Sequence, residues 1–529
     1  MSKLYIADKP TLDKVLEKVD LVLGNLMALN DDETLKTKVA ANYFNTRKTG
    51  KVFGVFFNKY SISSVSTGIR KFDAVGMIAR PSTDSVAERN DFDEYAIFNG
   101  LTVNGHVDTN GDFVVEYFEG EEGFSKTTKD TYVLFGTSYV NISIDSTGET
   151  ISLSDVERDG YFPMPGAVRP DGSIRPFIPI AKYYASSGTD GKVASLSGKE
   201  AYHNNASHNW CLTEFHKKGT QYCATTMQDR FLLETLFQVV FATRDTQSIM
   251  RGCTNYNYQP NVAKVESGAT NRVLVTKGQG VNFIVGSKAS VGTGTNKDRN
   301  VADSYKYANR RHVVKVEASI TVDGTQYDAI YLDGDPFTLV GTSDFISTMP
   351  WDTGACDNVL GSCGSHVDNT TGRTPFIFFG VEMAIGLWEV MGNAIYKQES
   401  TDIKKGAVYI CYDCANLATA PDTHYVKVGY NIAGGENAWK YISELGFDKQ
   451  NPCARMATGL AATTTTGYAD GQYTNNVANN YEVLVGGGLS NGDSAGFFCR
   501  SLGNALTGSA WNISARLSAT GKCGVKAAA

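Results

Sequence analysis

The first clear pattern along the chain is an apolar repeat with helical spacing. Five apolar residues near the start follow one another at steps of four and three, which is the seam of a heptad. These residues are Leu12, Leu16, Val19, Leu23 and Leu26. The spacing predicts a helix whose apolar side either packs on its own domain or joins other helices in a short bundle. We therefore expect residues 1–40 to form an N-terminal helical segment for attachment or oligomerisation.

Farther along, the pattern changes to alternation with a period of two. The segments EYAIFNGLTVNG, GDFVVEYFEG and DTYVLFGTSYVNISID alternate or run apolar over strand lengths, and Asn-Gly pairs separate them. Alternation is typical of strands with one buried face, and Asn-Gly favours hairpin turns. We predict a β-sandwich-like domain over residues 41–158. His106 and Asp108 fall in one of its turns, where a solvated loop is the simplest interpretation.

A third region begins where proline and glycine become frequent, at residues 161–179. Residues 227–244 then predict a helix with apolar side chains on nearly all faces, and such a helix belongs inside a core. Strands, glycine loops and aromatic residues continue to the end, with one amphipathic segment at residues 436–445. The whole chain is predicted to be a β-rich α+β protein, with its third domain over residues 159–529.

Composition and charge narrow the classes of function. Apolar residues make up 42% of the chain and charged residues 20%, which is ordinary for a folded protein. The net charge is -7 and no basic tract occurs, so a nucleic-acid partner is not expected. The first residues are charged and contain no apolar signal core, and the longest apolar run, Leu233–Ala242, is too short for a bilayer. We expect a soluble protein that is made without export and does not insert into membranes.

The ten cysteines form no repeated framework. Cys411 and Cys414 have the spacing of a zinc or redox motif, but no second pair follows at zinc-finger distance. Structural thiols are therefore preferred over a metal or disulfide role. Cys356 and Cys363 flank a glycine-rich loop and could pair, although a protein made in the cytosol does not depend on disulfides. No cofactor, metal ligand or catalytic residue is assigned, and whether a structural metal ion is bound stays open.

Three sequence blocks of the third domain occur in the order of one known family. The first contains IAKYYASS from Ile180, HNWCLTEFHKKG from His208 and the helix from Met227. The second is GLWEVMGN from Gly386, and the third runs from YEVLVGGG at Tyr481 to WNISARLS. Together these blocks resemble formylglycine-generating-enzyme-like domains, which have a C-type-lectin-type fold.

The resemblance implies roles for particular residues. Trp388 of the second block should pack in the core, and Gly486 and Gly487 should supply a tight turn at the beginning of the third block. The enzymes of this family use a pair of nearby cysteines in the terminal region, whereas Cys499 has no close cysteine neighbour in the sequence. Binding is therefore expected in place of catalysis.

The third block is more similar still to one branch, the variable proteins of diversity-generating retroelements, especially adhesins of bacteriophage tails. In that branch the segment is rewritten at the adenines of Asn-type codons, which never yields Lys, Glu, Gln, Met or Trp. None of these five residues occurs from Leu484 to Ala510. The resemblance places a variable region at about residues 484–517.

This resemblance implies a receptor-binding protein of a bacteriophage tail tip or tail fibre, carried on the virion and used for attachment to the host. Its expected partners are a bacterial surface receptor (a protein or a glycan), other phage tail proteins and two further copies of itself in a homotrimer. Threefold presentation would multiply weak contacts into avidity. Two alternatives stay open: an oxidase of the formylglycine-generating type and a variable protein of a bacterial cell surface.

Small polar residues interspersed with aromatic ones are typical of an adaptable binding surface. We expect the side chains of the binding face to be mostly exposed and clustered, and their burial in the core would contradict the variable region. Of its two adjacent phenylalanines, Phe498 is expected to face the ligand, and Cys499→Ser should leave the fold intact. The predicted face comprises Leu489, Ser490, Asp493, Ser494, Phe497, Phe498, Cys499, Arg500, Ser501, Asn504, Thr507 and Ser509.

Overall fold

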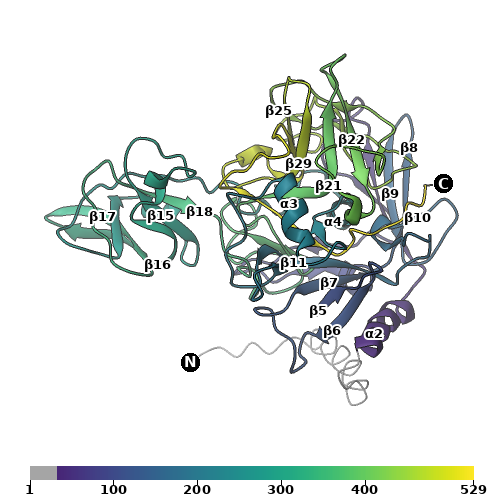
Figure 1. The fold of residues 1–529 in the computed structure, drawn as a ribbon, viewed down its shortest axis with the longest axis horizontal. Coiled ribbons are helices and arrows are strands. Elements are labelled where there is room, and N and C mark those ends of the chain that lie inside the picture. The colour runs from purple at the N-terminus through teal and green to yellow at the C-terminus, as the bar shows by residue number, and fades with distance from the viewer. Residues whose placement is uncertain (1–32, 529) are drawn as a thin grey trace.

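Strands dominate the computed structural model, which describes residues 33–528 (Figure 1). The β-rich α+β class expected from the sequence is confirmed. The apolar seam predicted at residues 12–26 lies outside the described residues. Within the described part of the chain the helices are α2 (Glu33–Thr46), α3 (His208–His216) and α4 (Met227–Phe241).

We call the described residues outside 260–349 the body. Helix α2 lies on its surface and runs through the boundary that we expected at residue 40 (Figure 1). Its residues Ala40, Tyr43 and Phe44 are buried, and the Phe44 and Phe177 ring centroids are 6.1 Å apart. This helix thereby covers apolar side chains of the neighbouring sheet, which includes Phe113.

The first sheet is built from strands near the N-terminus, in the order β10-β8-β9-β1-β2. Its neighbouring strands are antiparallel. On β1, Phe53, Val55 and Phe57 point into the core, as a period of two predicts. The strands are β1 (Val52–Asn58), β2 (Ile69–Phe72), β8 (Tyr139–Ile144), β9 (Gly148–Ser154) and β10 (Phe162–Pro163).

The second sheet joins segments that are far apart in the sequence, in the order β13-β32-β11-β7-β5-β6 with β12 beside β11. Val133 of β7 faces Ile180 of β11, and Tyr184 of β11 faces Arg516 of β32. The division expected between residues 158 and 159 therefore runs through one continuous sheet. Its strands are β5 (Leu101–Val107), β6 (Phe113–Phe118), β7 (Thr131–Gly136), β11 (Phe177–Ser187), β12 (Val193–Ser195), β13 (Cys223–Ala224) and β32 (Arg516–Ser518).

A nine-stranded sheet follows, in the order β23-β22-β21-β29-β30-β28-β25, with β24 beside β22 and β31 beside β21. Its strands are β21 (Trp388–Gln398), β22 (Lys405–Cys411), β23 (Tyr425–Lys427), β24 (Ile432–Ala433), β25 (Ala438–Tyr441), β28 (Gly471–Thr474), β29 (Asn480–Gly486), β30 (Gly496–Leu502) and β31 (Ile513–Ser514). Short pairs outside the large sheets are β3 (Ala79–Arg80) with β4 (Arg89–Asn90), β19 (Phe376–Phe378) with β20 (Val381–Met383), and β26 (Glu444–Leu445) with β27 (Ala457–Gly459).

Helix α4 lies inside the body, and all of its residues are buried. The prediction from its apolar faces is confirmed, although the helix ends at Phe241, three residues before the predicted end. Thr226 and Asp229 form a capping box, in which each side chain accepts a hydrogen bond from the other residue's backbone N–H. Ala242 ends the helix in the left-handed region, with a φ of 50°.

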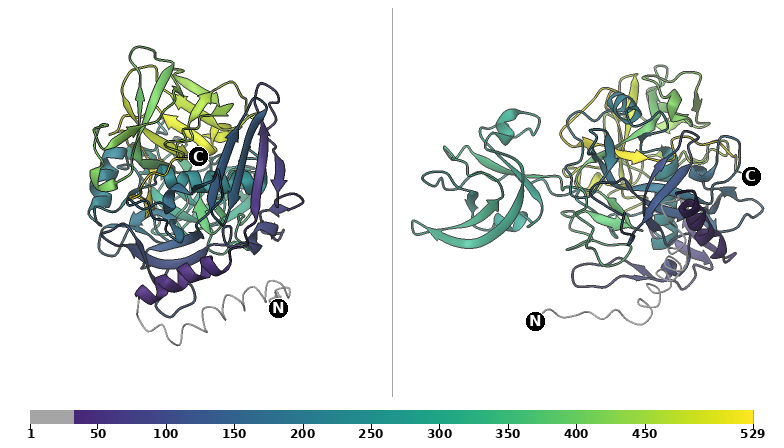
Figure 2. Two further views of the ribbon diagram at one scale, coloured as in Figure 1. Left: turned by 90° about the vertical axis from the view of Figure 1, so that its right-hand side faces the viewer. Right: turned by 60° about the horizontal axis from the view of Figure 1, so that its bottom comes forward.

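Residues 260–349 form a separate sheet that protrudes from the body (Figure 1 and the right-hand view of Figure 2). We call this part the inserted domain; the sequence did not reveal it. It has its own apolar core, and its two ends lie side by side. Tyr258 N donates to Thr348 Oγ1 over 3.0 Å, and Thr348 N donates to the Tyr258 carbonyl over 3.0 Å. Its strands are β14 (Arg272–Thr276), β15 (Lys288–Gly292), β16 (Ala308–Val322), β17 (Thr325–Leu332) and β18 (Phe345–Met349).

Ion pairs connect the inserted domain to the body. Lys288 Nζ lies 2.8 Å from Asp352 Oδ1, and His312 Nε2 lies 3.0 Å from Asp352 Oδ2. Arg310 Nε lies 3.7 Å from Glu200 Oε1. The cations Lys288 and Arg310 and the imidazole of His312 thus face carboxylates of the body, which orients the inserted domain at its base.

We predict that residues 258–349 fold when they are expressed alone. The reason is that they bury a core of their own and that their ends are hydrogen-bonded neighbours, as in other inserted domains. Thermal unfolding followed by circular dichroism should give one cooperative transition. A featureless melting curve together with a collapsed amide NMR spectrum would show that the inserted domain depends on the body.

Candidate ligand-binding surface

The terminal block forms a strand, a loop, a second strand and a second loop. Strands β29 and β30 pair antiparallel, with Val485 opposite Arg500. Gly486 and Gly487 begin the first loop with φ values of 88° and 101°. Because residues with a side chain rarely adopt such values, both positions favour glycine. The turn itself comes after them, where Asn491 N donates to the Gly488 carbonyl over 3.1 Å. Trp388 is 5% exposed, so its predicted place in the core is confirmed too.

The prediction that the binding face is mostly exposed is wrong. Seven of its twelve side chains are buried, and most of these belong to β30 or its approach. The buried seven are Leu489, Ser494, Phe497, Phe498, Cys499, Arg500 and Ser501. Ser490, Asp493, Thr507 and Ser509 are exposed, and Asn504 is half-buried. By the criterion given above, this burial contradicts a variable region that includes β30. The exposed residues of the predicted face are confined to two surface loops.

Both phenylalanines of β30 belong to the core. The Phe497 ring stacks on Phe237 of α4 with centroids 4.9 Å apart and meets Phe378 at 5.3 Å. The Phe498 ring packs edge-on against Tyr468 at 4.8 Å. The expectation that Phe498 faces a ligand is therefore wrong, because β30 lies between helix α4 and other core elements.

Arg500 and Cys499 are also buried in the interior. The Arg500 guanidinium forms an ion pair with Glu234, which also pairs with Arg230 Nε at 3.0 Å, and all three side chains are nearly inaccessible to water. Burial raises the pKa of the Cys499 thiol well above its usual range. Cys499 is fully buried, so it does not face a ligand; that Cys499→Ser leaves the fold intact stays a prediction.

The exposed residues lie on two neighbouring loops, residues 487–495 and residues 503–512, which we call the loop surface. The Asn512 side-chain amide lies against Gly488, and the Asn512 carbonyl accepts a hydrogen bond of 2.8 Å from Trp388 N. Asp493 Oδ1 lies 2.6 Å from Arg251 Nη2, and its side chain is 62% exposed. Both loops thus present polar side chains from a braced backbone.

Two aromatic residues beside the loop surface were missed by the sequence analysis. Trp439 of β25 and Tyr473 of β28 face each other across paired strands, with ring centroids 5.7 Å apart. Trp439 also stacks on Trp388 at 6.0 Å. Its ring lies next to Ser494, and both aromatic side chains are half-buried. The sequence analysis noted residues 436–445 only as an amphipathic segment, and Trp439 belongs to it.

The inserted domain braces the far end of the second loop. Arg310 Nη2 donates to the Trp511 carbonyl over 2.9 Å, and Trp511 N donates to Asn300 Oδ1 over 2.9 Å. The Arg299 guanidinium lies 4.6 Å from the Trp511 ring centroid. Residues of the protruding domain thus fix the position of the loop that carries Thr507 and Ser509.

Other chemistry of the described residues is limited. All ten cysteines are free and buried. Among residues 33–528, one group of three possible metal ligands lies together: Glu33, His106 and Glu116. His106 is on β5 and its Nδ1 lies 2.9 Å from Glu116 Oε1, so the solvated loop expected for it is wrong. Within the same residues, no helix is long and apolar enough to cross a bilayer.

Comparison with known proteins adds nothing to this geometry. No protein-family model matches the chain. No curated protein matches it either.

We predict that Phe497→Ala lowers the free energy of unfolding by about 3–5 kcal/mol, because it empties a fully packed aromatic site. Thr507→Ala, in the exposed loop, should change it by no more than about 0.5 kcal/mol. Chemical denaturation of the two variants and the unaltered chain measures both values. Equal small effects would mean that β30 is exposed in solution.

Glu482 predicts a dependence of stability on pH. Burial raises the pKa of its carboxyl from 4.5 to about 8, while its Oε2 accepts a hydrogen bond of 2.8 Å from His208 N. The folded state therefore holds a proton that the unfolded state releases, so stability falls as pH rises from about 4.5 to 8. Glu482→Gln should flatten this part of a Tm-against-pH curve. Parallel curves for the two proteins would contradict the assignment.

Proposed function

We propose that the chain is a receptor-binding protein whose contact region is the loop surface. The observation that carries this proposal is the juxtaposition of two braced polar loops with the half-buried rings of Trp439 and Tyr473. Aromatic side chains provide rigid contact area, and short polar side chains provide adaptable hydrogen bonds. The inserted domain stands next to this region and adds a second protruding wall.

The order of elements supports a C-type-lectin-type fold for the third region. The first long strand of that region, β11, pairs antiparallel with the last strand, β32. Helices α3 and α4 follow β11, and the hairpin-rich sheet of β21, β22, β29 and β30 comes between α4 and β32. The three sequence blocks thus meet in one body in the order that the resemblance implies.

Diversification, if the chain belongs to the variable-protein branch, is restricted to the loops. Randomised residues at Phe497, Phe498 or Arg500 would leave cavities or unpaired buried charges, which are strongly destabilising. Ser490, Asp493, Thr507 and Ser509 tolerate exchange because their side chains are exposed, whereas the half-buried Asn504 side chain hydrogen-bonds the buried Glu482 carboxyl. The proposal therefore retains four of the twelve predicted residues and adds Trp439 and Tyr473.

Oxidase activity is the weaker alternative. Thiol oxidation begins from a thiolate, and burial holds the Cys499 thiol in its protonated form. Burial likewise raises the pKa of the Cys523 thiol to about 12. Both thiols are therefore protonated near neutral pH, and neither provides the thiolate that oxidation requires.

Assignment to a bacteriophage tail, the homotrimer and the bacterial receptor rests on the sequence resemblance alone. Under this proposal the virion carries several copies, and the apolar seam of the N-terminal segment contributes to their assembly or docking. A protein or a glycan on the bacterial surface would then be the bound partner.

Binding to whole bacterial cells tests the proposal. Fluorescently labelled chain is mixed with a panel of Gram-positive and Gram-negative bacteria and measured by flow cytometry. We expect binding to a subset of strains, and a loss of about fivefold or more when Trp439→Ala and Asp493→Ala are combined, as for contacts near the centre of an interface.

Asp84→Ala is the matched control, since Asp84 is an exposed carboxylate outside the loop surface. It should bind as the unaltered chain does. Loss of binding in the control, or full binding by the double variant, would remove the loop surface from the proposal.

A further inference from the structure

Exposed apolar side chains gather on one part of the first sheet. Seven of the 17 large apolar side chains that are exposed among the described residues lie between residues 62 and 86. Three of them belong to β2 or to the turn after it: Ile69 and Phe72 are each 55% exposed, and Val75 is 67% exposed. Strand β2 is an edge strand of its sheet. Exposed apolar groups that gather at a sheet edge indicate a contact with another chain.

These side chains form one patch on the outer face of the sheet. Alternate residues of β1 fill the core, so Gly54 and Phe56 face outward. Phe56 stands opposite Ile69, and the Phe72 ring covers Gly54, where a side chain would meet it within 2.9 Å. Val75 N donates to the Phe72 carbonyl over 3.2 Å, which holds Val75 in the adjoining turn. We call Phe56, Ile69, Phe72 and Val75 the outer patch.

The backbone places the Phe72 ring on this face at a cost. Its register partner Phe53 faces the core, and opposite residues of paired strands share a face, so a regular strand would direct Phe72 inward. Instead, Phe72 has a φ of 55°, in the left-handed region that bulky residues rarely adopt. Strain of this kind is concentrated at functional sites. The exposed ring is thus a second, independent indication of a contact surface.

Charges on either side of Phe72 are self-complementary. Lys71 precedes it and Asp73 follows it, and both side chains are exposed. An apolar residue lies three positions away in each direction. The guanidinium of Arg70 is directed elsewhere, because it donates to carbonyl groups at the end of α4. Read in reverse, the segment therefore offers an anion to its own cation and an apolar side chain to its own apolar side chain.

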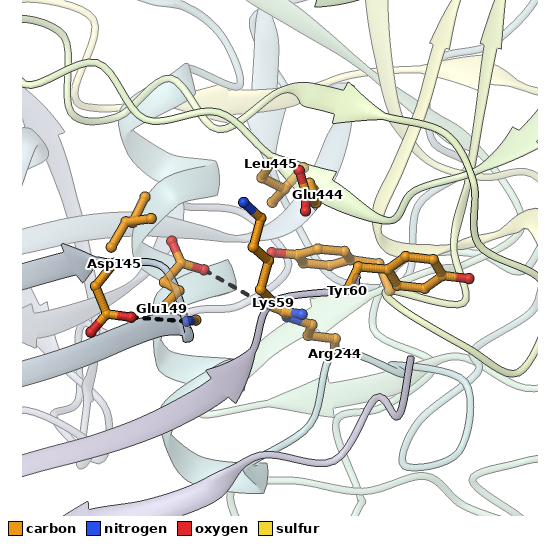
Figure 3. A pocket seen from close by; sticks show the side chains of 10 residues that line it. Lys59, Tyr60, Asp145, Glu149, Arg244, Glu444 and Leu445 are labelled. Atoms are coloured by element: carbon orange, nitrogen blue, oxygen red, sulfur yellow. Dashed lines mark hydrogen bonds and ion pairs between the residues drawn. The ribbon is translucent and has the colours of Figure 1, made fainter. Parts of the chain in front are cut away.

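A charged cavity beyond the end of β1 is not part of this patch (Figure 3). It has a volume of about 160 Å³, and Arg244 Nη2 and Glu149 Oε2 lie 3.7 Å apart beside it. Its lining contains two cations and three carboxylates: Lys59, Arg244, Asp145, Glu149 and Glu444. Such walls do not suit an apolar contact, so the contact surface is confined to the outer patch and its flanking charges.

We propose that the outer patch joins two copies of this chain about a twofold axis beside Phe72. The two Phe72 rings meet at the axis, Ile69 of each copy packs on Val75 of the other, and Lys71 of each copy pairs with Asp73 of the other. A second copy is the partner that fits, because a twofold interface must be its own complement. The contact is independent of the loop surface and of the threefold arrangement proposed above, since a twofold axis relates different copies.

Sedimentation velocity of the full chain at several concentrations tests this contact. We expect reversible pairing with a Kd of about 10 µM, as for a small interface. Lys71→Asp and Asp73→Lys, each made alone, place like charges on both sides of the axis and should weaken pairing by about tenfold or more. An equimolar mixture of the two variants restores opposite charges on both sides. It should pair as the unaltered chain does, a recovery that misfolding of either variant cannot produce.

Phe72→Asn tests the apolar centre. Asparagine adopts the left-handed conformation more readily than phenylalanine, so the variant should keep the far-ultraviolet circular dichroism of the unaltered chain. Its pairing should weaken by about tenfold or more, as for a residue at the centre of an interface. Lys192→Asp is the control, since Lys192 is an exposed lysine outside the outer patch. Its Kd should equal that of the unaltered chain.

Three results would overturn the proposal. The first is an unaltered chain whose mass does not change with concentration over the range of the expected Kd. The second is pairing that persists in Phe72→Asn, which would assign the association to another surface of the chain. The third is a mixture of Lys71→Asp and Asp73→Lys that pairs no better than each variant alone.

Discussion

The whole body depends on satisfying the polar groups of the buried helix α4. At its N-terminus, Met227 N donates to Asn393 Oδ1 over 2.9 Å, and Thr520 Oγ1 donates to Asp229 Oδ1 over 2.7 Å. At its C-terminus, Arg70 Nη1 donates to the Val239 carbonyl over 3.0 Å. A buried helix leaves its terminal N–H and C=O groups without water, so such partners are required. The first sheet, the nine-stranded sheet and the end of the chain are thereby held to one element.

The same requirement explains why β30 is part of the core. Glu234 of α4 carries a charge into the interior, and Arg230 and Arg500 compensate it from both sides. The Phe497 carbonyl also accepts hydrogen bonds from the guanidinium groups of Arg230 and Arg500. Removing one member of such a buried group typically costs about 3–5 kcal/mol. A strand that supplies these contacts has little freedom to vary, whereas the exposed side chains of the loops on either side of it make no buried contacts of this kind.

The sequence predicted the parts that follow from local patterns. Apolar residues on every face identified α4 as a core helix, and adjacent glycines marked two positions with positive φ at the end of β29. The burial of β30 was also readable, because Phe497 and Phe498 are adjacent and a strand with apolar residues on both faces is buried on both. The small polar residues of the surrounding loops concealed this signal, since they were interpreted together with the strand.

Other features have no local signature. The pairing of β7 with β11 joins residues 47 positions apart, as Val133 and Ile180 are, and the pairing of β11 with β32 joins Tyr184 to Arg516, 332 positions away. Alternation identifies a strand but not its neighbour. The inserted domain escaped notice for the same reason. Its strands have the same pattern as the strands of the body, and its ends at Tyr258 and Thr348 become neighbours only in the folded chain.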